Sequence, residues 1–481
     1  KTAVITLSED STDFVLADLT LTNATATLSG SGSSYTAVLT PIADGTVALS
    51  VGVGTFSDAA GNLNTAASNE VTTTFDGTAP TVQLSTLATS VTGSAPVDID
   101  VVFSEAVTGF DATDLVVTNG SASAVTGSGA VYVATIIPTG AGDTDVTLPA
   151  ASARDAAGND NTASNTLVVS NTIVADTQEV IAKFMQTRAN LLVNSQPGLT
   201  GFLTGGQSGF FNAGATDQNG FFSFASTPGG RGNLWVRLNG NWSKEKTSKS
   251  LYVIGTIGSH LTVTPDLLVG AMLEFDYLSQ DDGLSSIEGR GWLAGPYVVA
   301  KMPDQPLFFE GRLLYGQTSN DVSPIGTYTD RFDTKRLLAM AKISGEMQYD
   351  RTKIMPSLQV SYTTDDQESY VDRFGNTIPG QGITLGQIEL GVDFSHFFVW
   401  EENGRSIELT GGIAAIGSSV RGRGYASTVA PEYEGGRAKI KLGLNYRTKN
   451  GGSFFVDSEY DGIGAKNFES YGLRIGYDLD F

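Results

Sequence analysis

The C-terminal end of the chain alternates apolar and polar residues with a period of two. From Tyr471 onward, one face of the predicted strand carries the apolar side chains Tyr471, Leu473, Ile475, Tyr477, Leu479 and Phe481. The opposite face carries Gly472, Arg474, Gly476, Asp478 and Asp480. A transmembrane β-barrel needs strands of about ten residues with an apolar face toward lipid and a polar face toward the lumen. The pattern therefore favours a membrane-spanning barrel over a soluble β-sandwich.

Similar alternation divides residues 231–481 into twelve predicted strands. In one of them Ile388, Leu390 and Val392 alternate with polar neighbours, as expected of a strand between lipid and lumen. The predicted strands lie near 231–243, 250–262, 266–279, 288–301, 306–317, 332–349, 352–364, 383–399, 406–418, 436–448, 452–461 and 468–481.

The connections between these strands alternate in length. Long connections are predicted at 243–249, 280–287, 318–331, 365–382, 419–435 and 462–467, and short ones at 263–265, 302–305, 350–351, 400–405 and 449–451. Long loops on one side and tight turns on the other are typical of outer-membrane barrels with an even number of strands. A soluble sandwich has no reason to alternate in this way.

One segment before the barrel, residues 176–194, has a helical pattern. Asp176 is the predicted N-cap, with Glu179 at capping-box spacing, and Pro197-Gly198 ends the segment. Nineteen residues at 1.5 Å each span about 28 Å, close to the thickness of a bilayer core. A helix of this length just before a barrel can thread its lumen, and a spacer helix packed on a soluble domain is the alternative.

The first third of the chain contains an internal repeat of about 96 residues, since Ser8-Glu9 matches Ser104-Glu105. The sequence Asp-Ala-Ala-Gly-Asn at 58–62 recurs at 155–159. Short alternating runs separated by Gly, Asn and Ser indicate that both copies are all-β sandwiches. The first copy lacks the opening strands of the second, so we expect further repeats upstream of Lys1.

These observations predict an all-β protein with five parts. Residues 1–75 form an incomplete β-sandwich repeat, and residues 76–175 form a second repeat. Residues 176–194 form the helix, 195–230 a linker rich in Gly, Phe and Ser, and 231–481 the twelve-stranded barrel.

The charge of the chain is uneven. The formal net charge is −22, and residues 1–175 hold only two basic residues against seventeen acidic ones. This acidic region excludes nucleic acid as a partner, because binding a phosphate backbone needs clustered Lys and Arg. The absence of cysteine fits a protein that crosses an oxidising compartment.

Acidic residues near the repeat junction and turns are candidate calcium ligands. They are Asp76, Asp98, Asp100, Glu105 and Asp155. The alternative is that Asp58 and Asp155 close Asx-type turns, in which Gly61 and Gly158 supply positive φ. No dense Asp-x-Asp-x-Asp loop is present. We therefore favour the turn role and expect no cofactor, with calcium in the repeats as the alternative.

Residues 1–172 resemble bacterial Ig-like repeats, in which a Phe-Ser-Glu segment, here at 103–105, and an Asp-Ala-Ala-Gly-Asn turn recur. Residues 176–481 resemble the autotransporter family of type V secretion, with family-like segments at 289–296, 319–324 and 328–332. The resemblance implies an N-terminal passenger, a helix within the lumen and a twelve-stranded barrel ending on an aromatic residue. It also implies a Gram-negative outer membrane, with its lipid as the barrel's surroundings and the passenger outside the cell.

The alternation that ends at Phe481 also resembles the C-terminal signal read by the bacterial barrel assembly machinery. That signal would comprise Ile475, Tyr477, Leu479 and Phe481. Lumen charges are predicted to contact the helix. The candidates are Lys183 and Arg188 on the helix and Arg237, Glu310, Arg312, Glu389, Lys441 and Arg474 on the wall.

The predicted function is an outer-membrane anchor and translocator that displays its Ig-like passenger for adhesion or surface-layer structure. Its partner outside the cell would be an unidentified ligand or a neighbouring surface protein. A porin-like channel with accessory Ig domains is the alternative, and it predicts an open lumen. An enzyme is not expected, because its catalytic histidine would have to be His260 or His396, and neither has an evident Ser or Asp partner in the sequence.

Overall fold

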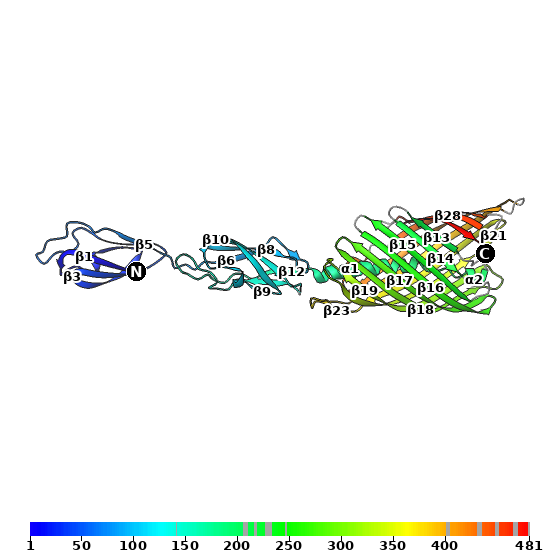
Figure 1. Ribbon diagram of the computed structural model, residues 1–481, viewed down its shortest axis with the longest axis horizontal. Helices are drawn as coiled ribbons and strands as arrows, with labels where there is room; N and C mark the ends of the chain where they lie inside the picture. The colour runs from blue at the N-terminus through cyan, green and yellow to red at the C-terminus, as the bar shows by residue number, and fades with distance from the viewer. Residues whose placement is uncertain are drawn as a thin grey trace. The chain divides into compact units, whose positions relative to one another are not determined.

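The structure is a computed structural model of the whole chain. The residues described are 1–140, 142–204, 210–215, 219–226, 233–245, 248–400, 405–430, 435–447, 452–464 and 470–479. They form two compact units, Lys1–Asn171 and Thr172–Phe481, and each is described by itself (Figure 1). No helix in the described part of the chain is both long and apolar enough to span a bilayer.

The first repeat is a sandwich of two antiparallel sheets. One sheet pairs β1 (Thr2–Ser11) with β3 (Ala24–Pro41), and the other has the order β2 (Leu19–Thr22), β4 (Gly45–Val51), β5 (Val71–Phe75). Alternate residues of the strands face inward and bury an apolar core, as the period of two requires. The aromatic rings of Phe14, Tyr35 and Phe56 meet edge to face within it.

The second repeat has two further strands. One sheet has the order β10 (Gly120–Pro138), β8 (Val97–Val107), β6 (Val82–Ser85). The other has the order β7 (Ser90–Val91), β12 (Leu167–Asn171), β11 (Thr144–Thr147), β9 (Val116–Thr118). β8 therefore pairs on both sides, whereas among the described residues the equivalent β1 pairs only with β3.

Both repeats contain the same two local features, a tyrosine–carbonyl hydrogen bond and a turn held by an aspartate. The hydroxyl of Tyr35 donates to the Ser11 carbonyl at 3.1 Å, and that of Tyr132 donates to the Val107 carbonyl at 3.1 Å. In the turn at 58–62 the Asp58 carboxylate accepts from the backbone N–H groups of residues 60 and 62. The turn role predicted from sequence is therefore present, with Gly61 at φ 88°.

The second unit opens with α1 (Ile173–Asn194), which is three residues longer than predicted. Its N-cap is Thr172 rather than Asp176, and the predicted capping box does not form. The Thr172 hydroxyl instead donates to the Asp176 carboxylate, while Glu179 forms an i,i+4 ion pair with Lys183. A short helix, α2 (Gly201–Thr204), follows. Figure 1 shows α1 and α2 at opposite ends of the barrel.

Within the described residues, the barrel is one antiparallel sheet of fifteen strands. They are β13 (Phe210–Ala215), β14 (Asn219–Ser226), β15 (Leu234–Glu245), β16 (Ser248–Thr264), β17 (Leu267–Asp282), β18 (Ser285–Lys301), β19 (Leu307–Ser323), β20 (Asp330–Gly345), β21 (Met347–Tyr349), β22 (Thr352–Gln367), β25 (Gln381–Trp400), β26 (Arg405–Arg423), β27 (Gly435–Arg447), β28 (Gly452–Ile463) and β29 (Ser470–Leu479). The sheet closes because β20 pairs with β22 and β13 pairs with β29. In a bilayer a closed sheet avoids the unpaired backbone groups of an open edge.

All twelve predicted strands are present, but the prediction of a linker at 195–230 was wrong. β13 and β14 arise in that segment and pair with β29 and β15. β21 continues β20 after a single residue, so fourteen strand positions rather than twelve encircle the lumen. The error has a local cause, since β13 has only six residues and the Gly- and Phe-rich run lacks a clean alternation.

The two faces of the barrel wall differ as the alternation requires. On β25, Ile388 and Leu390 are 54% and 60% exposed, while Gln387, which precedes Ile388 and lies on the opposite face, is buried. On β17, Phe275 points outward and Asp276 is buried inside. Large apolar side chains with no protein cover are costly in water, and a lipid environment removes that cost.

The connections also differ between the two ends. One end carries the connection with hairpin β23–β24 (Tyr370–Val371 and Thr377–Ile378) and the one with α3 (Ala426–Val429). We call this the long-loop end, and the other the short-turn end. Several strands continue beyond their predicted limits, so that only Gly283 and Leu284 separate β17 from β18 where eight loop residues were expected.

Candidate functional site: the occupied barrel lumen

Helix α1 lies inside the barrel. Its buried residues cover well over half of the helix circumference, and the remaining side, which includes Glu179, Lys183 and Asn194, is half buried or exposed. They are Ile173, Thr177, Gln178, Ile181, Ala182, Phe184, Met185, Gln186, Arg188, Ala189, Leu192 and Val193. Apart from Ile173, the apolar ones share a single core with inward-facing residues of the strands. The helix therefore fills part of the lumen by ordinary core packing.

A buried ionic network connects the middle of α1 to the wall. The Arg188 guanidinium donates to the Asp276 carboxylate at 2.8 Å and to the Asn320 side-chain oxygen at 2.8 Å. Asp276 also accepts two hydrogen bonds from Arg336 on β20, at 3.0 and 2.6 Å. All three ionised side chains are almost inaccessible to solvent. A buried charge is stable only when it is paired in this way.

A second network holds the turn that follows the helix. The Glu310 carboxylate accepts from the backbone N–H groups of Leu199 and Thr200, each at 3.0 Å. Arg312 donates to the Pro197 carbonyl at 2.7 Å and pairs with Glu310 at 3.1 Å. These side chains bind main-chain groups. They therefore hold the path of the backbone after α1 and depend little on which side chains that segment carries.

At the long-loop end, α1 meets the loops. The Gln381 amide donates to the Gln178 carbonyl at 3.0 Å, and α1 contacts both β24 and α3. Ala426 of α3 is fully buried in the core around the helix. The N-terminal half of α1 therefore lies at the end that carries the long loops.

The structure places the eight predicted lumen residues in three groups. Arg188, Glu310 and Arg312 form the two networks around α1 and its following turn. Lys183 forms an ion pair at 2.7 Å with Glu179 on the helix itself. Arg237 donates to Asn239 on its own strand.

Of the last three residues, Glu389 and Lys441 lie away from the networks. Glu389 and Lys441 face a hollow on the wall formed by β22 and β25–β27, together with Asp393 and Lys439. Arg474 lies in β29, whose side chains are outside the described residues. The same applies to Ile475, Tyr477 and Leu479, while Phe481 itself lies beyond the described residues.

Sequence reasoning missed Asp276, Arg336 and Asn320, which complete the first network. Their register was available in the sequence, because outward Phe275 places Asp276 inside. The pairing of β17 with β20 through space was not available, since the two strands are not neighbours in the sheet. The two histidines contact hydroxyl groups: His260 Nδ1 lies 2.9 Å from the Tyr297 hydroxyl, and His396 Nδ1 lies 2.7 Å from the Thr352 hydroxyl.

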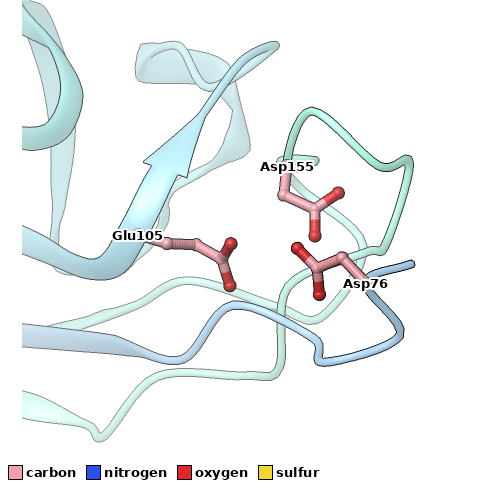
Figure 2. A group of neighbouring side chains, drawn as sticks. All are labelled: Asp76, Glu105 and Asp155. Atoms are coloured by element: carbon pink, nitrogen blue, oxygen red, sulfur yellow. The ribbon is translucent and has the colours of Figure 1, made fainter. Parts of the chain in front are cut away.

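In the first unit, three of the five calcium candidates lie together (Figure 2). The ligand oxygens of Asp76, Glu105 and Asp155 are within 4.8 Å of one another. Asp98 and Asp100 are exposed and do not belong to this group, and the Asp98 carboxylate accepts from the Thr135 hydroxyl at 2.7 Å. Three carboxylates supply oxygens of the kind that hard cations bind, although Ca²⁺ takes six to eight.

The three carboxylates are not equivalent. Asp155 closes its turn and accepts from the backbone N–H groups of Gly158 and Asn159 and from the Asn159 amide. Burial raises its pKa, but these hydrogen bonds outweigh burial and the pKa lies below its ordinary value. Burial raises the pKa of Glu105, and the negative charges of Asp76, Asp155 and Asp44 raise it further. Ionisation of the Glu105 carboxyl is thus disfavoured by its surroundings.

A closed antiparallel barrel with an apolar outer face and a helix in its lumen defines a class, the plugged outer-membrane β-barrel. The comparisons with known proteins agree. The autotransporter β-domain family matches residues 234–459, and the bacterial Ig-like domain family matches residues 1–75 and 76–171. None of the curated proteins matches the sequence. Residues 234–459 are thus an autotransporter β-domain, and residues 1–75 and 76–171 are two bacterial Ig-like domains.

Solved structures with similarity to the chain include three autotransporter domains. The β-domain of BrkA from Bordetella is 14% identical with a TM-score of 0.37, covering 52% of this chain and 99% of that one. The translocator domain of NalP from Neisseria meningitidis is 14% identical with a TM-score of 0.40, covering 63% and 99%. The transport unit of AIDA-I from Escherichia coli is 14% identical with a TM-score of 0.35, covering 64% and 99%. These similarities are too distant to assign a role to any residue.

Proposed function

We propose that the barrel anchors the chain in the outer membrane and that α1 remains in the lumen as a plug, holding the Ig-like repeats outside the cell. The observation that carries the proposal is the buried Arg188–Asp276–Arg336 network. A helix that merely passed near the barrel would have no reason to bury an arginine against a wall carboxylate. The cost of burying these charges is met only when the helix is seated.

The direction of the chain supports the same arrangement. Autotransporters are outer-membrane proteins with extracellular passengers, and the repeats precede α1. Because the N-terminal half of α1 contacts the long-loop end, that end faces outside and the short-turn end faces the periplasm. In lipid the charges of Lys183 and Arg188 would be costly, whereas the lumen provides a polar wall.

Deleting residues 173–194 tests the plug. The single-channel conductance of the purified chain in planar bilayers should rise severalfold. The barrel should remain folded, as measured by its heat-modifiable migration on gels. Lys183→Gln is the matched control, because that side chain is half exposed and pairs with its own helix, so conductance should not change. High conductance in the unaltered chain that the deletion leaves unchanged would instead support the porin-like alternative.

We further propose that Ile475, Tyr477, Leu479 and Phe481 are read by the barrel assembly machinery. The support is their alternation in the sequence, and Ile475, Tyr477 and Leu479 belong to β29, which pairs with β13 at the closure of the barrel. Replacing Phe481 with Ser should reduce the amount of folded barrel in outer membranes, and Asp480→Asn is the matched control on the opposite face. Normal assembly of the Phe481 variant contradicts this role.

For the passenger we propose a role in adhesion or surface-layer structure rather than catalysis. The support is the absence of His and Cys from residues 1–171, together with their acidic, Thr- and Ser-rich surface. Cells displaying the full chain should attach to a surface or to neighbouring cells better than cells displaying residues 172–481 alone. Equal attachment by the two strains would remove this role.

A further inference from the structure

The inward face of β25 changes character along its length. Near the long-loop end, Ile383 and Leu385 are fully buried against the helix core. Farther along the same face, Glu389 and Asp393 are only half buried. Asp393 lies eight positions after Leu385, which corresponds to about 26 Å along a strand. On β25 the inward face is therefore dry and packed near the long-loop end and polar from the middle of the strand onward.

The dry end is built by loops as well as by α1. Hairpin β23–β24 is fixed by the turn at 372–376, in which the Asp372 carboxylate accepts from the backbone N–H groups of residues 374 and 376. Ile378 of this hairpin is fully buried, and Tyr370 stacks on Phe332 with ring centroids 6.0 Å apart. α3 packs so closely on β26 that a Cβ at Gly422 would overlap the backbone of Ala426.

The polar part of this wall carries charges of both signs. The hollow on this wall is bordered by Glu389, Asp393, Lys439 and Lys441, and its floor includes Gly391 and Gly412. Of these four charged residues, Lys439 forms an ion pair within the described residues, with Glu459 at 3.5 Å. Charged groups cannot remain unpaired in a dry interior, so water must reach this face. The side-chain oxygen of Gln387, at the boundary, is buried and accepts no hydrogen bond from the protein.

We propose that the permeability barrier of the barrel lies at its long-loop end, where hairpin β23–β24 and α3 close around α1. The wall of Glu389, Asp393, Lys439 and Lys441 then borders a water-filled vestibule that admits small ions from the periplasmic side. The proposal rests on the plug described above, and it assigns the barrier to the loops together with the helix. A plug that filled the whole lumen would have no need of a charged wall opposite it.

Cysteine labelling tests the proposal, because the natural chain has no cysteine. Single variants Asp393→Cys and Leu385→Cys of the full chain are reconstituted in liposomes and treated from outside with a small anionic maleimide. Two exposed positions report orientation: Thr327→Cys at the long-loop end and Gln305→Cys at the short-turn end. The labelled fraction of Asp393→Cys should equal that of Gln305→Cys, and Leu385→Cys should stay unlabelled.

Replacing residues 370–378 with a Gly-Ser linker supplies the second arm. In that background Asp393→Cys should label in both orientations, while α1 keeps its protection from protease. Labelling of Asp393→Cys that follows Thr327→Cys, or no labelling at all, overturns the vestibule. Unchanged sidedness after loop replacement overturns the loop barrier. Failure of the plug itself would show separately, as unchanged conductance when residues 173–194 are deleted.

Discussion

The two units of this protein bury polar groups in different ways. The Ig-like repeats enclose apolar cores, and in their turns carboxylates such as Asp58 bind backbone N–H groups. The barrel buries Arg188, Asp276 and Arg336 deep in its lumen. A sandwich packs its own strands around one core, so no separate segment has to be positioned inside it. A helix entering a preformed lumen needs contacts that identify one seated position, and paired charges identify a position more strictly than apolar contacts do.

We expect the largest loss of stability from Asp276→Asn in the barrel. The change leaves Arg188 and Arg336 buried together without their shared counter-ion, and removing one partner of a buried pair costs about 3–5 kcal/mol. We expect the midpoint of urea unfolding in detergent to fall and α1 to become sensitive to protease. Arg188→Met is the matched variant, in which Asp276 keeps Arg336, so its loss should be smaller. Equal losses in the two variants would contradict the shared counter-ion.

The outer face of the barrel gives the next largest effect. Leu390→Arg places a charge near the middle of β25 on the lipid side, at a cost of about 2–4 kcal/mol. The amount of folded barrel recovered from outer membranes should fall. Glu389→Gln, one residue away on the lumen face, should assemble normally. A barrel that tolerates Leu390→Arg as well as Glu389→Gln would show that the assigned register is wrong.

A smaller effect is expected from the repeats. Tyr132→Phe removes a hydrogen bond to the Val107 carbonyl and should lower the unfolding free energy of the second repeat by about 1 kcal/mol. Tyr35→Phe should do the same in the first repeat, through Ser11. Calorimetry of the full chain measures both in the transition of the first unit. The barrel transition is the internal control and should not move.

The smallest effect concerns Glu105 and depends on pH. Because the folded-state pKa of Glu105 lies above its ordinary value, the protonated form favours folding, and stability from this group declines as pH rises through that pKa. Glu105→Gln should therefore raise the melting temperature of the first unit at neutral pH and change it little at pH 4. Asp155 behaves oppositely, because its pKa is lowered, and its contribution is lost as pH falls.

Calcium sharpens the same test. We favour the turn role of Asp155, whose oxygens already accept three hydrogen bonds, and so expect chelator to leave the melting temperatures of wild type and Glu105→Gln unchanged. If calcium raises the melting temperature of the wild type but not of Glu105→Gln, then the three carboxylates bind the cation, and the expectation of no cofactor is wrong.

The sequence by itself determined the strands, their lipid-facing and lumen-facing sides, and the turns of the repeats. These follow from local rules: a period of two assigns the faces of a strand, and the Asp-Ala-Ala-Gly-Asn pattern closes its own turn through neighbouring backbone groups. Glu310 and Arg312 could be placed in the lumen for the same reason. The length of α1 was nearly right, since its helical period is also local.

Tertiary structure decided the rest. β13 joins the sheet because closure of the barrel needs partners for β14 and β29, a demand that no short segment expresses in its own pattern. Likewise Asp276, Arg336 and Arg188 are distant in the sequence and meet only when the barrel has closed and α1 is seated. Pairing across a lumen depends on strand order, register and helix depth together, so the choice of partners among many inward charges belongs to the folded chain.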